Sequence, residues 1–255
     1  MMSALREEDF LYARLSLHRR AVERARKRIA RAQTKPGRWA VSFSAGKDST
    51  VTLALVREQA PDTLAVMVDS GAEFPEALTF AGATPNVVIE PAVIPLLDMY
   101  RMTGEHGAAA EMPDTHWGRD DIKASVLVMP MQRLYERHSI TGVYTGLRGD
   151  ESSARETFGA TRSQPWRGAG DLWRCEPLID WTEADVWAYI ASHALPYCPV
   201  YDRYAEIGAP RHVWRVAPYA GGTAIGYGRW AWLRRGWPEL WEQFAAAFPY
   251  VRSYV

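Results

Sequence analysis

The stretch Val41-Ser42-Phe43-Ser44-Ala45-Gly46-Lys47-Asp48-Ser49-Thr50 is the part of the chain around which the rest is organised. Apolar residues 39–43 predict a short buried strand, and residues 49–58 predict a helix, with small and polar residues between them. A strand, a tight turn and a helix in this order point backbone N–H groups and a helix N-terminus at a phosphate. The turn is not a Walker A loop, because Val41 replaces its first glycine and Asp48 follows the lysine. An ordinary turn between a strand and a helix is the alternative.

Composition places the chain among ordinary globular proteins. Its 255 residues suit one α/β domain with an appendage, and 47% of them are apolar and 24% charged. No apolar run approaches the length of a membrane span and the N-terminus is charged, so we expect a cytoplasmic protein without membrane contact. The two cysteines, Cys175 and Cys198, lack CxxC spacing, which predicts neither disulfides nor a cysteine-built metal or iron–sulfur site.

Charge is distributed unevenly although it sums to zero. Residues 1–38 carry eleven Lys and Arg against four Asp and Glu, a net charge of +7, and the remainder carries −7. An amphipathic helix with a basic outer face from Arg19 to Arg31 is predicted by six apolar residues at helical spacing: Phe10, Leu17, Ala21, Ala25, Ile29 and Ala32. Lys35-Pro36-Gly37 should end this helix. Packing on the domain or on a second subunit is the preferred interpretation, and a contact with nucleic acid is the alternative.

Strands and helices alternate after the first loop. Strands are predicted at residues 63–68, 86–89 and 141–145, and helices at 74–80 and 122–138. This alternation predicts an α/β fold with a mostly parallel sheet and helices on both faces. Ligands of such sheets lie beyond the carboxyl ends of the strands. Residues 44–49, 69–71 and 146–151 all follow predicted strands, so we expect them to meet there.

Four ordered segments within residues 39–203 resemble the 3′-phosphoadenosine 5′-phosphosulfate (PAPS) reductase family of PP-loop ATP pyrophosphatases. Residues 44–49 resemble the PP-loop Ser-Gly-Gly-x-Asp-Ser, and residues 68–76, VDSGAEFPE, resemble Asp-Thr-Gly…Phe-x-Glu. Residues 146–156, GLRGDESSARE, are similar to Gly-x-Arg-x-(Asp/Glu)-(Glu/Ser)-x-x-Arg. Residues 177–190, PLIDWTEADVWAYI, with the Pro-x-x-Pro-Val-Tyr run at 196–201, are the most specific match. Ala45 replaces the first PP-loop glycine, so its turn should avoid conformations that only glycine enters easily.

The resemblance implies a Rossmann-like fold of the adenine nucleotide alpha hydrolase type that cleaves ATP between its α- and β-phosphates. The nucleotide would be bound by Ser44, Ala45, Gly46, Lys47, Ser49, Asp69, Ser70, Gly71 and Gly146. Lys47, Asp48 and Arg148 would be catalytic, and Lys123, Arg148 and Arg155 would bind phosphate or an anionic acceptor. Asp48 could hold Mg²⁺, orient Lys47 or cap the helix. Ordinary structural roles compete: a turn for Asp69, ion pairs with Asp150 and Glu151 for the arginines, and solvation for Lys123.

The strongest family segment has a structural explanation. Thr182 should cap a helix, with Asp185 at its third position in a capping box. Trp181, Val186, Trp187 and Ile190 should be core. This segment identifies the family without carrying its chemistry.

One departure from the family bears on the activity. Sulfonucleotide reductases use a nucleophilic cysteine near the C-terminus, and this sequence has no cysteine after Cys198. PAPS reduction is therefore disfavoured, and adenylyl transfer with pyrophosphate release is expected. Similar chemistry occurs in the small subunit of sulfate adenylyltransferase and in enzymes that activate nucleic acid for sulfur insertion. A sulfonucleotide reductase-like enzyme and a non-catalytic module that senses nucleotide or binds nucleic acid are the alternatives, and the acceptor stays open.

The C-terminal region is rich in arginine and tryptophan. Between Ala209 and Pro238 there is no acidic residue, but there are five arginines (Arg211, Arg215, Arg229, Arg234, Arg235) and four tryptophans (Trp214, Trp230, Trp232, Trp237). The region from Arg211 to Arg235 could bind nucleic acid. A small cap with a tryptophan core is the preferred interpretation, and residues 237–248 should form a last helix. We expect a basic helix (1–38), a nucleotide-binding domain (39–203) and this extension (204–255).

Overall fold

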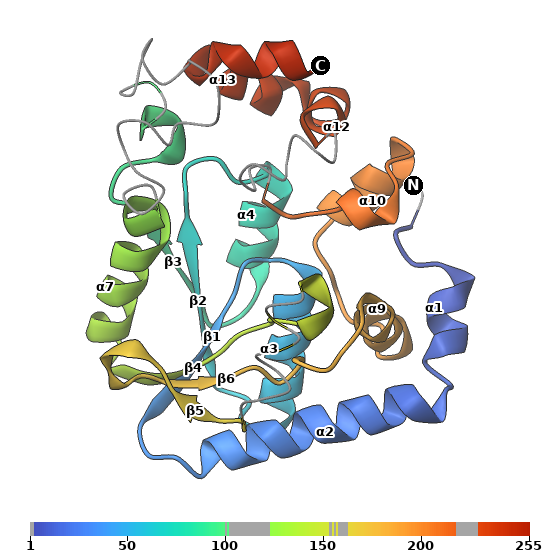
Figure 1. The fold of residues 1–255 in the computed structure, drawn as a ribbon, viewed down its shortest axis with the longest axis vertical. Helices are drawn as coiled ribbons and strands as arrows, with labels where there is room; N and C mark the ends of the chain where they lie inside the picture. Colours follow the sequence, from blue (N-terminus) through green and yellow to red (C-terminus); the bar gives the residue numbers. More distant parts are fainter. Residues whose placement is uncertain are drawn as a thin grey trace.

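The chain is built on a six-stranded sheet with the strand order β3-β2-β1-β4-β6-β5 (Figure 1). The structure, a computed structural model, describes residues 3–99, 101, 123–152, 155, 157, 163–217 and 229–255. The strands are β1 (Arg38–Ser42), β2 (Leu64–Asp69), β3 (Val87–Pro91), β4 (Ile140–Tyr144), β5 (Trp166–Arg167) and β6 (Trp173–Cys175). All pairings are parallel except that of β5 with β6. The predicted mostly parallel, Rossmann-like sheet is confirmed, although β5 and β6 were not predicted because two and three residues show no period.

The order in which the strands are added to the sheet reverses between β1 and β4. From β1 the chain moves outward through β2 to β3 on one side, and β4 and β6 lie on the other side. This is the point at which an open parallel sheet binds its ligands. The loops that follow β1 and β4 therefore lie where the sequence predicts the site.

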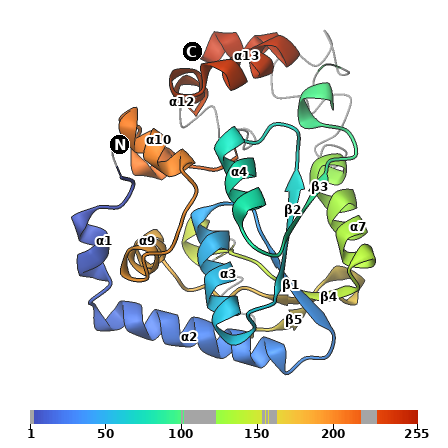
Figure 2. The same ribbon diagram turned by 180° about the vertical axis from the view of Figure 1, so that it is seen from behind.

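Helices cover both faces, as predicted. On one face, α3 (Lys47–Gln59), α4 (Pro75–Ala83), α2 (Ser16–Gln33) and α9 (Glu183–Ser192) enclose the main core, which includes Val41 and Met67. On the other face, α7 (Met129–Arg137) packs Leu134 against Val66 and Val143. Figure 2 shows α3 and α7 on opposite sides of the strands. Neighbouring residues of one strand point to opposite faces, so both faces of each central strand are buried.

The predicted helix at residues 122–138 is not a uniform α-helix. It consists of a π-helical turn, η1 (Ala124–Val128), followed by α7, while Ile122 lies outside the described residues. Pro130 has no N–H and its ring crowds the carbonyl four residues earlier, which explains the widened turn before it.

The N-terminal region forms two helices where one was predicted. Four of the six residues predicted to form the apolar face of one helix are buried: Ala21, Ala25, Ile29 and Ala32. The other two, Phe10 and Leu17, are 45% and 47% exposed. The chain breaks after α1 (Glu7–Tyr12), so helical spacing does not continue from Phe10 into α2. This break explains why the prediction for Phe10 was wrong. The prediction for Leu17 was wrong as well, because its side chain at the start of α2 is exposed. Helix α2 ends at Gln33, before Lys35-Pro36-Gly37, as expected.

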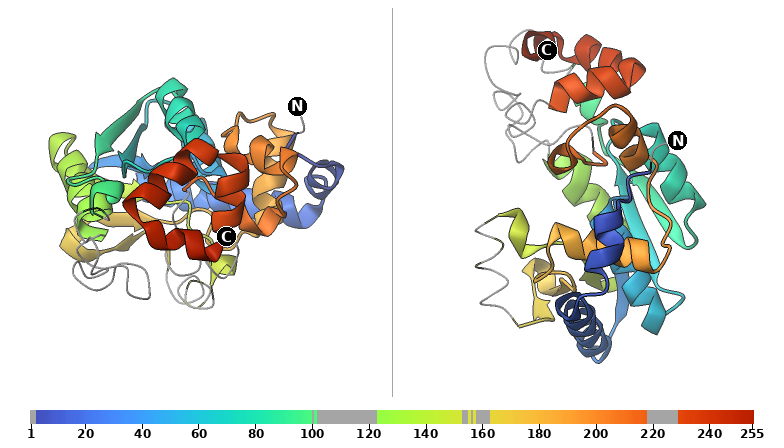
Figure 3. Two further views of the ribbon diagram at one scale, coloured as in Figure 1. Left: turned by 90° about the horizontal axis from the view of Figure 1, so that it is seen from above. Right: turned by 90° about the vertical axis from the view of Figure 1, so that its right-hand side faces the viewer.

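Part of the basic face of α2 packs against the domain. Arg24 and Arg28 both bind the carboxylate of Asp180, and Arg26 binds Glu58 through two hydrogen bonds. These three arginines are held by carboxylates on neighbouring elements, which is the packing that the preferred interpretation expected. Helix α2 lies at the opposite end of the molecule from the C-terminal helices (Figures 1 and 3).

The capping box of α9 is confirmed. The Oγ1 atom of Thr182 accepts a hydrogen bond from the Asp185 N–H, and the Asp185 carboxylate accepts one from the Thr182 N–H. Trp181, Val186, Trp187 and Ile190 are buried, as predicted. Asp185 also lies 3.0 Å from the Nδ1 atom of the buried His18, a link from α9 to α2 that the sequence did not indicate.

The C-terminal region is a tryptophan-rich cap. After α10 (Val200–Glu206), α12 (Arg229–Gly236) and α13 (Pro238–Ala247) lie together beyond the end of the sheet toward which β2 points (Figures 1 and 2). Trp214, Trp230 and Trp237 are buried, while Gly221-Gly222 and Gly226 to Gly228 fall outside the described residues. Trp237 donates a hydrogen bond to Glu76 of α4 at 2.9 Å.

Among the described residues there are also four short 3₁₀ turns: η2 (Gly149–Glu151), η3 (Ala169–Asp171), η4 (Arg211–Val213) and η5 (Pro249–Tyr254). Within the described ranges, no helix combines the length and apolar character that crossing a bilayer requires.

Ile29 and Leu17 lie on the same helix but should differ in their contribution to stability. We expect Ile29→Ala to lower the free energy of unfolding by about 2–4 kcal/mol, because it opens a cavity in the core. Leu17→Ala should change it by less than about 0.5 kcal/mol, because that side chain is half exposed. Urea denaturation measures both. Equal losses would contradict the burial of Ile29 and the exposure of Leu17 on this helix.

Candidate functional site

The PP-loop (residues 44–49) turns directly from β1 into α3, whose N-cap is Gly46. The Ser44 N–H donates to the Ser49 hydroxyl at 3.2 Å, and that hydroxyl lies 2.9 Å from the carbonyl of Gly46. The two serine hydroxyls are 3.2 Å apart. The loop therefore brings Ser44 and Ser49 together at the N-terminus of α3, where the sequence predicts phosphate binding.

Ala45 occupies the conformation that its sequence context was expected to avoid. Its φ is +59°, in the left-handed region that glycine enters at low cost. The expectation for this turn was therefore wrong: Ala45 adopts a backbone conformation that favours glycine. The methyl group is fully buried, so its packing compensates for part of the backbone strain.

Gly146, which follows β4, lies against the first turn of α3. A Cβ atom at this position would be 2.8 Å from the carbonyl carbon of Asp48 and 2.9 Å from the nitrogen of Ser49. Only a residue without a side chain permits this approach of the two loops. The predicted meeting of Gly146 with the PP-loop is thus present in the structure.

Ion pairs link the PP-loop to the segment after β4. The Nζ atom of Lys47 lies 3.0 Å from Asp48 Oδ2 and 3.4 Å from Glu183 Oε1. The Nε atom of Arg148 lies 2.6 Å from Asp48 Oδ1, and its Nη1 atom lies 2.6 Å from Asp150 Oδ1. Lys47 and Arg148 are 3% and 4% exposed. Both predicted catalytic cations are therefore buried and bound to carboxylates.

The protonation of Asp48 follows from these neighbours. Burial alone would raise the pKa of its carboxyl group, but Lys47 and Arg148 outweigh burial and lower the pKa below its usual value. Asp48 is thus an anion that holds two cations in place. No side chain caps the N-terminus of α3, so Asp48 orients Lys47 and does not act as the cap.

The arrangement does not fit a magnesium site built by the protein. Both oxygens of Asp48 face cations, and Mg²⁺ would have to compete with Lys47 and Arg148 for them. Among the residues that the structure describes, no group of three or more His, Cys, Asp or Glu side chains could hold a metal ion.

The remaining predicted residues lie apart from this cluster or at its edge. Asp69 accepts a hydrogen bond from the Gly71 N–H at 2.8 Å, and Ser70 donates one to Glu73 at 2.7 Å. The carbonyls of Asp69 and Ser70 accept hydrogen bonds from Ala92 and Leu96, so this turn after β2 is bonded to the segment after β3. Lys123 is exposed before η1. Arg155 pairs with Glu151, as the structural alternative expected.

A cavity of about 360 Å³ opens beside the PP-loop. It is lined by residues of the loop itself, by Thr145, Gly146 and Leu147 after β4, by Glu151 and Arg155, and by Tyr201, Trp214, Arg215 and Val216. Sequence analysis did not place the last four at the site. The Tyr201 hydroxyl accepts a hydrogen bond from the Lys47 N–H at 2.8 Å. Tyr201 belongs to the Pro196–Tyr201 family run, which was the one available signal for it.

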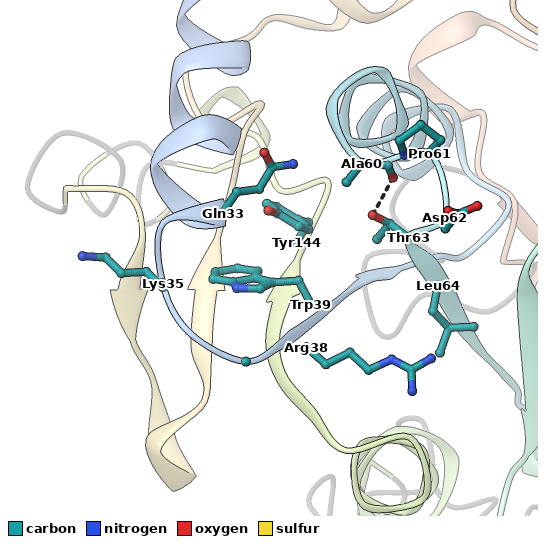
Figure 4. A pocket seen from close by; sticks show the side chains of 11 residues that line it. Gln33, Lys35, Arg38, Trp39, Ala60, Pro61, Asp62, Thr63, Leu64 and Tyr144 are labelled. Atoms are coloured by element: carbon teal, nitrogen blue, oxygen red, sulfur yellow. Dashed lines mark hydrogen bonds between the residues drawn. The ribbon is translucent and has the colours of Figure 1, made fainter.

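A second cavity, of about 440 Å³, lies at the other end of β1 (Figure 4). It is bounded by the start of β1 and by residues 60–64, where α3 turns into β2. Trp39 and Tyr144, which line it, pack against each other with their rings tilted by 35° and the ring centroids 4.7 Å apart. It lies away from the PP-loop and Gly146, so we assign the candidate site to the first cavity.

The strain at Ala45 predicts an unusual mutational result. Ala45→Gly relieves about 1–2 kcal/mol of left-handed strain, which should offset the loss of a buried methyl group and the added flexibility of glycine, together about 1–2 kcal/mol. We expect the free energy of unfolding, measured in urea, to change by less than about 1 kcal/mol. The matched control is Ala65→Gly in β2, which is buried, carries no such strain and should lose about 1–2 kcal/mol. Equal losses of unfolding free energy in Ala45→Gly and Ala65→Gly would show that Ala45 carries no backbone strain.

The buried ion pairs predict an acid-sensitive contribution to stability. Asp48→Asn leaves Lys47 and Arg148 short of a carboxylate and should lower the free energy of unfolding at neutral pH by about 3 kcal/mol. Because the folded-state pKa of Asp48 is lowered, its contribution is present above the unfolded pKa, about 4, and is lost as pH falls through the folded value. The difference in the free energy of unfolding between wild type and Asp48→Asn should therefore become smaller in acid. Asp62→Asn, on an exposed turn, is the control and should show no gap.

Comparison with known proteins shows the family. Residues 38–212 match the phosphoadenosine phosphosulfate reductase domain. The phosphoadenosine 5′-phosphosulfate reductase of Xanthomonas campestris pv. campestris (strain B100) is 35% identical over 189 residues, covering 72% of this chain and 76% of that protein.

Two solved structures share the fold. One is the PAPS reductase of Candida auris, with a TM-score of 0.51 and 21% identity over 73% of this chain and 88% of that one. The other is the U34-tRNA thiolase NcsA of Methanococcus maripaludis, with a TM-score of 0.50 and 15% identity over 92% of this chain and 77% of that one. The resemblance seen in the four sequence segments is confirmed: this chain belongs to the PAPS reductase family of the PP-loop superfamily.

Proposed function

We propose that this chain binds ATP in the cavity beside the PP-loop and transfers its adenylyl group to an acceptor, with release of pyrophosphate. The observation that carries the proposal is the convergence of the α3 N-terminus and the Gly146 loop on one cavity at the switch point of the sheet. A helix N-terminus with small residues around it suits an anion, and the adjacent strand ends suit a nucleotide.

The state of the cysteines supports transfer over reduction. Cys175 and Cys198 are both fully buried. Burial raises the pKa of the Cys198 thiol to about 12 and raises that of Cys175 as well. Attack on sulfur requires an accessible thiolate, which neither residue supplies. In this respect the chain is closer in expected chemistry to adenylyl-transferring relatives, such as the small subunit of sulfate adenylyltransferase, than to the reductases.

In the proposed reaction, an oxygen of the acceptor attacks the α-phosphorus of ATP. The bond from that phosphorus to the bridging oxygen of the β-phosphate breaks, and pyrophosphate leaves with the electron pair. The PP-loop and the α3 dipole would hold the phosphates. Lys47, Asp48 and Arg148 would keep the two loops in register. Mg²⁺ would enter with the nucleotide phosphates.

Binding and turnover are tested separately. Isothermal titration with ATP, with and without MgCl₂, measures binding, and a pyrophosphate-release assay with sulfate, DNA and RNA as acceptors measures turnover. ATP binding with pyrophosphate release on one acceptor would support the proposal. Tight ATP binding without release on any acceptor would favour a non-catalytic nucleotide-sensing module, and no ATP binding would refute the site.

A sulfonucleotide substrate is the second candidate, because the Xanthomonas relative is named a PAPS reductase. PAPS and ATP would share the adenosine and phosphate contacts of the same cavity. A competition titration distinguishes them: PAPS that displaces ATP with higher affinity, and sulfite formation with an added thiol donor, would favour a reductase-like enzyme.

A nucleic-acid partner is a further part of the proposal. Arg24, Arg26 and Arg28 are held in ion pairs, so DNA or RNA would have to meet the exposed Arg19, Arg20 and Arg31 on α2 or the arginines of the C-terminal cap. A filter-binding titration at increasing salt tests it, because phosphate contacts weaken steeply with salt. Affinity that salt does not change would count against the partner. A homo-oligomer or a partner protein on the exposed part of α2 also stays a prediction.

The close approach of Gly146 offers a test of the site. Gly146→Ala places a methyl group against the Asp48–Ser49 peptide and should push the two loops apart, lowering ATP affinity about tenfold or more. Gly82→Ala on α4 is the matched control, because a Cβ atom there meets nothing within 4 Å. Titration calorimetry compares the two. Unchanged ATP affinity in Gly146→Ala would place the nucleotide elsewhere.

A further inference from the structure

We propose that Arg215 binds the phosphate chain of the nucleotide and that the C-terminal cap thereby completes the site. This inference rests on the proposed function and names a residue for it. Arg215 lies beyond residues 38–212, the part of the chain that matches the family domain.

The backbone around Arg215 is fixed against the PP-loop. Next to it, Val216 has its Cγ2 atom 3.2 Å from the position that a Cβ atom of Gly46 would take. On its other side, Trp214 is buried and packs edge-to-face on Trp187 with ring centroids 5.9 Å apart. The hydroxyl of Tyr201, on α10 before this segment, accepts a hydrogen bond from the Lys47 N–H. Arg215 is thus held over the loop by packed neighbours on both sides.

The other cations near the cavity are already neutralised. Lys47 and Arg148 together lie within 4 Å of four carboxylates, those of Asp48, Asp150, Glu151 and Glu183. Arg155 pairs with Glu151. The charge of this cluster is therefore negative, and it would repel a polyphosphate.

Arg215 differs from these cations. Within the described ranges its side chain has one hydrogen bond, from Nη1 to the carbonyl of Trp214 at 2.8 Å, and it has no carboxylate partner. It lines the same cavity as the PP-loop. The guanidinium keeps four further N–H groups and its full charge, and its planar fork matches two phosphate oxygens. Arg215 therefore offers an uncompensated positive charge to a phosphate chain bound at the N-terminus of α3.

The test measures the affinities of ATP, inorganic pyrophosphate and adenosine for the full chain by titration calorimetry. Arg215→Ala should weaken ATP and pyrophosphate about 10- to 100-fold and leave adenosine within about twofold, because only the first two carry the phosphates. Arg215→Lys should lose less, since it keeps the charge without the fork. Arg234→Ala is the matched control: it is an exposed arginine of the same cap, on α12, and should leave all three affinities unchanged.

The outcomes separate this inference from the proposed function. Wild-type chain that binds neither ATP nor pyrophosphate overturns both. Wild-type chain that binds ATP, together with an Arg215→Ala variant of equal ATP and pyrophosphate affinity, overturns only the role of Arg215. An Arg215→Ala variant that melts at the wild-type temperature but loses adenosine as strongly as pyrophosphate also overturns it, because the loss would then not concern the phosphates.

Discussion

The buried carboxylate of Asp48 is the interaction on which the site depends. It lies between Lys47 of the same helix and Arg148 of the segment after β4, so it joins the two loops that flank the switch point. Buried cations are costly without an anion, and each loop supplies one of them. The loops are therefore stable only when they meet, and Gly146 provides the space in which they do. These ion pairs thus join the two loops that line the cavity.

These ion pairs also change the roles expected of Lys47 and Arg148. A lysine in a phosphate-binding loop and an arginine after the next strand suggest direct contacts with phosphate, but here both are occupied by carboxylates. The carboxylates cancel the charge of Lys47 and Arg148, so neither cation offers a phosphate an uncompensated positive charge. Positive charge for the ligand has to come from elsewhere. The cap supplies Arg215, which has no carboxylate partner among the residues that the structure describes.

The sequence predicted the elements that depend on local pattern. The PP-loop, the alternation of strands and helices and the capping box of Thr182 and Asp185 all rest on residues a few positions apart. It could not place Tyr201 or Arg215 at the loop, because each lies more than 150 residues from Lys47 and no period connects them. It also could not predict the break between α1 and α2, because Phe10 has the spacing expected for α2 but lies on α1. The left-handed conformation of Ala45 was not predictable either, because it depends on the packing around that residue.

The arginines of the cap show why composition alone could not decide their function. Arg211 and Arg215 are four residues apart in one segment without acidic residues. Arg211 binds Asp9 of α1 at 2.7 Å and stacks over Trp187, so it ties the N-terminal helix to the core. Arg215 faces the PP-loop cavity, where the carboxylates already hold other cations. Whether an arginine is structural or available to a ligand is therefore decided by the carboxylates that the fold brings near it, and these come from distant parts of the chain.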